Sequence, residues 1–210
     1  MSTRTVIDVS ELPHHGFDTL DPVWWGNNCL LAIETSMFAI TTVTYFYLRQ
    51  NFTEWPPPLA QLTAPLNPLP DLGFGTANLA LLLFSCLPMV MVDVATRRGY
   101  RPTVQFGLVV CLLLGFAAIA LRSFEFAAVK FRWDSNAYGS IVWFLLGLHF
   151  AHLITLTLET FLLALWSGVR EFDLKHRLDI TALAIYWYWV TAMWIVIYSV
   201  IYLSPRLLPK

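Results

Sequence analysis

Charged residues are scarce in this sequence. Only 13% of the 210 residues are Asp, Glu, Lys or Arg, while 57% are hydrophobic and the mean hydropathy is +0.60. A soluble domain carries roughly a quarter of its residues charged, so about half of the expected charge is missing. The net charge of −1 offers no basic surface for nucleic acid, which is not an expected partner. The composition therefore excludes an ordinary soluble domain and indicates an integral membrane protein.

Cysteine is also sparse. Cys29, Cys86 and Cys111 lie at or inside apolar segments without any Cys-x-x-Cys spacing, so we expect buried structural thiols rather than metal or disulfide chemistry. The N-terminal segment 1–25 is polar, contains four acidic residues and has no apolar core. We therefore expect no cleavable signal peptide, and the first hydrophobic segment should direct membrane insertion.

Five apolar runs are long enough to cross a bilayer, which takes about 20 residues. Lipid offers no partner for backbone hydrogen-bonding groups, so each run is expected to be a helix. The sequence predicts an all-α integral membrane domain over residues 26–205. Its five transmembrane helices are predicted at about 29–48, 77–95, 103–121, 139–166 and 180–203.

Basic residues in the short loops predict the orientation of these helices. The loops that follow the second and fourth runs carry six Lys or Arg residues, whereas the opposite loops carry three. Positive charge collects on the cytoplasmic side, so we predict an inside N-terminus and an outside C-terminus. The stretch 55–70 contains six prolines and is expected to be an extended outer connector.

Aromatic residues gather near the ends of the predicted spans, as in an interfacial belt. Those near span ends are Trp24, Trp25, Trp133, Trp166 and Tyr202. The aromatic residues expected to face lipid or to pack between helices are Trp24, Trp25, Trp187, Trp194 and Tyr198.

Ionisable residues inside a span each need a reason, because placing them in lipid costs at least a few kcal/mol. The functional candidates are Glu34, Arg122, Glu125, His149, His152 and Glu159. At 100° per residue, the last three fall within one face of about 80° on the fourth span, and we expect that face to point into the protein.

Two histidines on one helix are a possible ligand pair for metal or haem. A membrane haem usually takes axial histidines from two helices, and no other predicted span contains one. Glu159 lies two turns from His152, a poor position for a third metal ligand. Hydrogen bonding between helices is therefore the expected role of His149 and His152, and the sequence assigns no catalytic, cofactor or metal residue.

Each of the remaining charged candidates has two possible roles. Arg122 and Glu125 are three residues apart and are expected to form an ion pair, with pairing across a subunit boundary as the alternative. Glu34 is either a hydrogen-bonded structural carboxyl or a proton-exchanging group. Its partner is expected on a neighbouring helix, most simply the fourth.

Several motifs occur in an order that resembles one known family. They are Glu34 in the first span with PLNPLP after it, LRSFEF with Glu125, and SNAYGSIVWFLLGLHFAHLIT with His149 and His152. The last span adds Trp187, Trp194, Tyr198 and Tyr202. From about residue 26 to 203, the chain resembles subunit III of the haem–copper oxidases, which include cytochrome c oxidases and bacterial quinol oxidases.

The resemblance implies a non-catalytic subunit of a terminal oxidase. It would pack against subunit I, bind phospholipid and support proton uptake and the stability of the catalytic core, while partner subunits hold haem and copper. The family commonly has seven helices, and only the last five are present here. Five-helix members occur in bacterial oxidases, which implies a multi-pass protein of the bacterial cell membrane.

Two departures and two alternatives accompany this interpretation. Tyr188 and Thr191 stand where the family's terminal helix often has His and Asp, so no role is carried over to them. A five-helix accessory protein of a nitric oxide reductase has a similar length. A membrane haem or quinone enzyme belongs to a third class, which a visible spectrum would distinguish.

Overall fold

A computed structural model describes residues 21–57, 69–169 and 177–208. Five long helices form the described part of the chain, and each is apolar enough to cross a membrane by length and composition. They are α1 (Pro22–Gln50), α2 (Leu72–Arg97), α3 (Arg101–Ala128), α4 (Ala137–Val169) and α5 (Arg177–Tyr198). A π-helical turn η2 (Ser199–Leu203) and a short α6 (Ser204–Leu207) extend α5. The predicted all-α membrane fold with five spans is confirmed.

The helices run past the apolar segments that predicted them. α1 begins at Pro22, where the Asp21 side chain accepts a hydrogen bond from the Val23 N–H at 2.8 Å. An Asp cap followed by proline is a strong start signal, although it lies outside the apolar run. α3 continues to Ala128 rather than to about residue 121. Arg122 and Glu125 therefore lie within α3.

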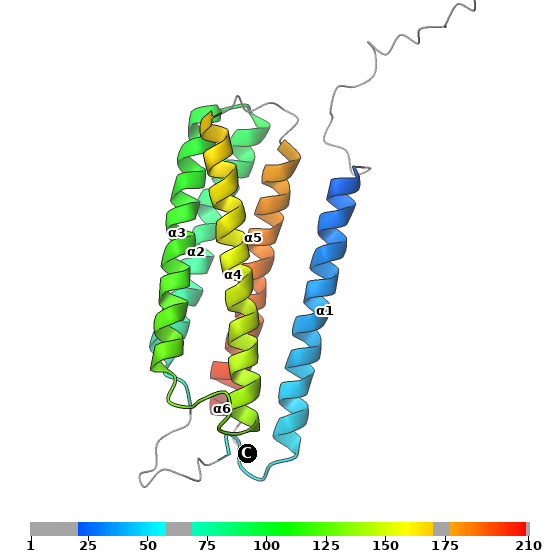
Figure 1. The fold of residues 1–210 in the computed structure, drawn as a ribbon, viewed down its shortest axis with the longest axis vertical. Coiled ribbons are helices and arrows are strands. Elements are labelled where there is room, and N and C mark those ends of the chain that lie inside the picture. Colours follow the sequence, from blue (N-terminus) through cyan, green and yellow to red (C-terminus); the bar gives the residue numbers. More distant parts are fainter. Residues whose placement is uncertain (1–20, 58–68, 170–176, 209–210) are drawn as a thin grey trace, which may run out of the picture.

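The helices alternate in direction and form a bundle (Figure 1). α2, α3, α4 and α5 pack against their neighbours, while α1 packs mainly on α4 and α5. In Figure 1, α1 stands to one side of the other four helices. Gly99 has a φ of 71° in the turn between α2 and α3, a conformation that glycine adopts without steric cost.

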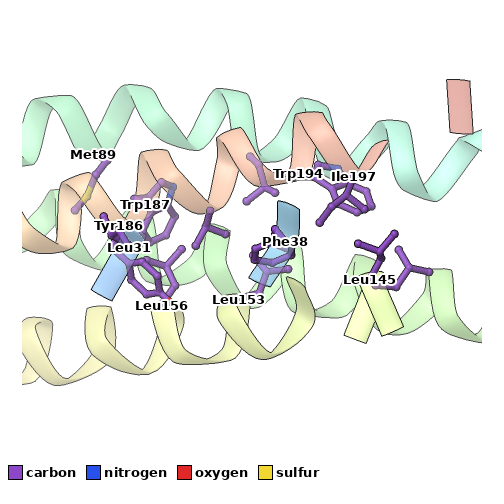
Figure 2. Packing of buried hydrophobic residues seen from close by; sticks show 14 of the residues in the cluster. Leu31, Phe38, Met89, Leu145, Leu153, Leu156, Tyr186, Trp187, Trp194 and Ile197 are labelled. Carbon is purple, nitrogen blue, oxygen red and sulfur yellow. The ribbon is translucent and has the colours of Figure 1, made fainter. Parts of the chain in front are cut away.

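Large aromatic residues fill the core together with leucines (Figure 2). Trp187 and Trp194 of α5 are fully buried, and Trp187 Nε1 donates to Ser85 Oγ of α2 at 2.8 Å. Leu31 and Phe38 bring α1 into the same core. Burial of a large apolar side chain contributes about 1.5–3 kcal/mol in water, but within lipid the close packing itself must hold the helices together.

The aromatic residues expected in the interfacial belt differ in their exposure. Trp25 and Trp133 are exposed, whereas Trp24 and Trp166 are half-buried. Tyr202 was expected in the belt, and this prediction is wrong because its side chain is fully buried.

The proline-rich connector can be followed only at its ends. The expected extended stretch falls largely on residues 58–68, which lie outside the described residues. At its start, Trp55 is buried and donates from Nε1 to the Tyr45 hydroxyl at 2.9 Å. This end of the connector therefore packs against α1.

Candidate functional site in the helix bundle

Four buried polar residues, which we call the core cluster, meet inside the bundle: Arg122, Glu125, His149 and Tyr202. Arg122 Nη1 donates to Glu125 Oε2 at 2.7 Å, and the two side chains are 0% and 3% exposed. The ion pair predicted from the spacing is therefore present within one helix. The guanidinium also lies over the ring of Trp194, with Cζ 3.6 Å from its centroid, a favourable cation–π position.

His149 joins α3 to α5 through the core cluster. Its Nδ1 lies 3.1 Å from Arg122 Nη2, and its Nε2 lies 3.1 Å from the carbonyl oxygen of Val190. A guanidinium can only donate and a carbonyl can only accept. Nδ1 must therefore accept from Arg122, and Nε2–H must donate to Val190, which assigns a neutral imidazole with its proton on Nε2.

Tyr202 completes the core cluster from the π-helical turn. Its hydroxyl hydrogen-bonds to Glu125 Oε1. A π-helical turn changes the direction of the side chains that follow, and such turns are frequent at functional sites. Gly75 of α2 lies against the ring, and a Cβ there would be 2.7 Å from Tyr202 Cζ. The buried position of Tyr202 therefore depends on a glycine in another helix, a dependence that sequence patterns did not reveal.

Glu34 and His152, which we call the peripheral pair, lie between α1 and α4. Glu34 Oε2 is 3.2 Å from His152 Nε2, so the partner expected on the fourth helix is His152. His152 Nδ1 is 2.7 Å from the carbonyl oxygen of Leu148 and must donate to it. Nε2 and Oε2 therefore share a single proton, either as imidazolium and carboxylate or as imidazole and carboxyl.

Aromatic residues surround the peripheral pair but leave it partly open. The side chains of Glu34 and His152 are 23% and 11% exposed. The rings of Phe38 and Trp189 lie 5.3 Å and 5.2 Å from the imidazole. Trp189 Nε1 also donates to Thr35 Oγ1 of α1 at 2.8 Å, so α1 has a polar link to α5 in addition to its link to α4.

Glu159 does not join either group. The sequence placed it on an inward face with His149 and His152, and this prediction is wrong because Glu159 is exposed. It lines a cleft of about 450 Å³ together with residues from the first part of α1 and the start of α5, including Asn27 and Asp179. The three residues share a side of α4, but at the level of Glu159 a cleft separates that side from α1.

The remaining candidates are aromatic residues with differing surroundings. Trp187 and Trp194 pack in the core, while Trp25 is exposed and Trp24 is half-buried. The Tyr198 hydroxyl lies 2.7 Å from Thr76 Oγ1 of α2, so Tyr198 links two helices rather than facing only lipid.

The histidines fit helix packing better than ligation of metal or haem. Both ring nitrogens of His149 and of His152 already have protein hydrogen-bond partners, and a guanidinium occupies the Nδ1 side of His149. Among the described residues, no group of three or more His, Cys, Asp or Glu side chains is arranged to hold a metal ion. Ligation would require His149 to give up its bond to Arg122 or to Val190.

These features define a class: a multi-pass helical membrane protein whose intramembrane polar groups hold its helices to one another. Residues 11–205 match the family model for cytochrome c oxidase subunit III, and the chain belongs to that family.

Curated relatives agree with this assignment. Cytochrome c oxidase subunit 3 of Pylaiella littoralis is 28% identical over 70% of this chain and 52% of its own length. The subunit of Petromyzon marinus is 26% identical over 91% of this chain and 73% of its own length. The subunit of Gallus gallus is 30% identical over 71% and 55%. The chain thus spans about half the length of most of the curated relatives it matches.

Proposed function

We propose that the chain is the non-catalytic third subunit of a haem–copper terminal oxidase. In this proposal it packs beside subunit I, and partner subunits hold the haem and copper. The observation that carries the proposal is the engagement of all four ring nitrogens of His149 and His152 by protein groups. The polar residues of the family's histidine block thereby serve helix association, which suits a subunit that supports a catalytic core.

The supporting role includes lipid binding, proton uptake and stability of the core. The cleft between α1, α4 and α5 has leucine-lined walls with Leu30, Leu162 and Leu183, a surface suited to acyl chains of a phospholipid. The peripheral pair is partly exposed, and the hydrogen bond between Glu34 and His152 requires a proton that either group can carry. In this proposal Glu34 assists proton exchange or conformational integrity without being an obligatory proton carrier.

The chain is shorter than most of its curated relatives, which bears on whether other chains supply helices to the assembly. Most of the curated relatives are about twice as long as the part of them that this chain matches. We propose that subunit I or a small additional chain supplies helices beside α1, which packs on the bundle mainly through α4 and α5. The proposed location is a bacterial cell membrane with the N-terminus inside. A bare α1 face in the structure of the assembly would contradict this arrangement.

Purification with partners tests the proposed function. The full-length chain carrying an affinity tag is isolated in mild detergent, and its partners are identified by mass spectrometry. Recovery of an oxidase subunit I, with oxygen consumption by the sample, is the expected result. Recovery of a nitric oxide reductase instead would assign the chain to the accessory class. A Soret band in the isolated chain, lost on His149→Ala, would show a haem protein.

Thiol labelling tests the proposed orientation. A cysteine introduced in the 55–70 connector should react with an impermeant maleimide added outside intact cells, whereas Arg98→Cys should react only after the membrane is opened. The opposite pattern would reverse the topology.

A further inference from the structure

Asn78 of α2 is an unusual residue for the core of a membrane bundle. Its side chain is 0% exposed, and neither Nδ2 nor Oδ1 has a hydrogen-bond partner among the described residues. Arg122 Nε and Trp194 Nε1 are likewise buried without a partner in the described part of the chain. Buried polar atoms are nearly always hydrogen-bonded, to protein or to ordered water, so a group of them in one place needs a cause.

Contacts between α2 and α3 place Asn78 near the level of Arg122. Cys111 Sγ lies 3.8 Å from Met89 Sδ on one side of this level. On the other side, the rings of Phe124 and Phe74 stack with centroids 6.2 Å apart. Because the two helices run in opposite directions, Asn78 comes within about one turn of Arg122 along α3.

Contacts between α2 and α5 place Asn78 near Trp194 in the same way. Trp187 Nε1 bonds Ser85 Oγ at 2.8 Å on one side, and Tyr198 Oη lies 2.7 Å from Thr76 Oγ1 on the other. Asn78 lies between Thr76 and Ser85, on the buried face of α2. The part of α5 opposite it therefore includes Trp194, one of the buried residues between Trp187 and Tyr198.

Arg122 and Trp194 are in direct contact. The guanidinium carbon lies 3.6 Å from the centre of the indole ring, so Nε and Nε1 are close to each other. Both are donors without acceptor capacity, and they cannot bond to one another. The Asn78 amide adds two donor hydrogens and a single acceptor oxygen. The site thus has more donors than acceptors, and any occupant that satisfies it must accept hydrogen bonds.

We propose that an ordered water molecule binds between Asn78, Arg122 and Trp194. It accepts hydrogen bonds from Arg122 Nε and Trp194 Nε1 and donates to Asn78 Oδ1, which is the usual number of bonds for a buried water. A neutral acceptor suits the site better than an anion, because Glu125 already balances the charge of Arg122 at 2.7 Å. The water ties α2 to the core cluster and fixes the guanidinium plane over the indole ring.

Two substitutions at Asn78 distinguish a site that holds a water molecule from a site that holds none. Leucine has nearly the shape of asparagine but excludes water and offers no acceptor, so Asn78→Leu should lower the unfolding temperature by roughly 3–6 °C. Asn78→Ala leaves room for a second water and should lower it less. At a dry site the order reverses, because replacing an unpartnered amide by leucine is favourable and alanine leaves a cavity.

The measurement uses the full-length chain with its partners in detergent. A fluorogenic maleimide reports when the fully buried Cys111 becomes exposed on heating, in a Cys29→Ser, Cys86→Ser background. Leu82→Ala, one turn further along α2 at an apolar buried position, is the control and should lower the unfolding temperature as a dry cavity does. An Asn78→Leu variant more stable than the parent, or less damaging than Asn78→Ala, would overturn the proposal.

A density map of the unaltered protein provides a test that does not depend on the variants folding. At about 2 Å resolution, a peak within hydrogen-bonding distance of Asn78 Oδ1, Arg122 Nε and Trp194 Nε1 is expected. A map in which the Asn78 amide bonds directly to the indole, with no such peak, would refute the water site.

Discussion

The core cluster and the peripheral pair both join helices through charged or ionisable side chains, yet they are built differently. The Arg122 and Glu125 side chains are 0% and 3% exposed, whereas those of His152 and Glu34 are 11% and 23% exposed. The core cluster contains a guanidinium, which stays charged in proteins, so its charge is fixed. The peripheral pair contains no fixed charge, because its hydrogen bond can form between imidazolium and carboxylate or between imidazole and carboxyl. The comparison suggests a rigid anchor in one place and an adjustable contact in the other.

Burial determines how much stability is lost when a residue of the core cluster or of the peripheral pair is replaced. Removing one partner of a buried ion pair leaves an uncompensated charge and costs about 3–5 kcal/mol, although replacing both partners by apolar residues is often neutral. The partly exposed pair can instead form its hydrogen bond between neutral groups, so breaking it leaves no uncompensated charge, and polar contacts of this kind between membrane helices contribute about 1 kcal/mol. The core cluster should therefore tolerate paired replacement better than single replacement.

The largest loss of stability is expected from Arg122→Met. It leaves the Glu125 carboxylate buried without its cation and removes the donor to His149 Nδ1. The free energy of unfolding should fall by about 3–5 kcal/mol, measured by denaturation in mixed detergent micelles. Arg97→Met is the matched control, because Arg97 pairs with Asp93 at 2.6 Å but its side chain is 51% exposed. A similar loss in both variants would contradict the assigned role of burial.

A smaller decrease in the free energy of unfolding is expected from Gly75→Ala. The added Cβ would lie 2.7 Å from Tyr202 Cζ, so the ring must move and its hydrogen bond to Glu125 weakens. Overpacking of this kind costs about 1–3 kcal/mol. Gly73→Ala serves as the control, since no atom lies within 4 Å of its Cβ, and alanine there should stabilise the helix slightly. Equal effects at the two positions would show that Tyr202 packing does not depend on Gly75.

The smallest effect on stability is expected from Glu34→Gln. The amide keeps a hydrogen bond to His152 but removes titration, so the free energy of unfolding should change by less than about 1 kcal/mol. Turnover of the co-purified oxidase should stay near that of the parent. A hydrophobic carbodiimide, which attacks carboxyls that meet lipid, should no longer label α1. Complete loss of turnover would make Glu34 an obligatory proton carrier and reject its supporting role.

The sequence predicted the five spans because a long apolar run in lipid can satisfy its backbone hydrogen bonds by forming a helix. It also predicted the Arg122–Glu125 pair and the α4 partner of Glu34, since helical spacing and the cost of buried charge are local arguments. The environments of Tyr202 and Glu159 were predicted wrongly. The first depends on a glycine of α2, and the second on the cleft between α1, α4 and α5. Both depend on packing between helices that are distant in sequence, which local patterns do not encode.

Two double-mutant cycles, run in parallel, test the central comparison most directly. One combines Arg122→Met with Glu125→Met, and the other combines Glu34→Gln with His152→Asn. The coupling energy should be about 2–3 kcal/mol in the core cluster, where paired replacement recovers much of the loss, and below about 1 kcal/mol in the peripheral pair. Equal coupling in the two cycles, or stronger coupling between Glu34 and His152, would contradict the distinction between a fixed anchor and an adjustable contact.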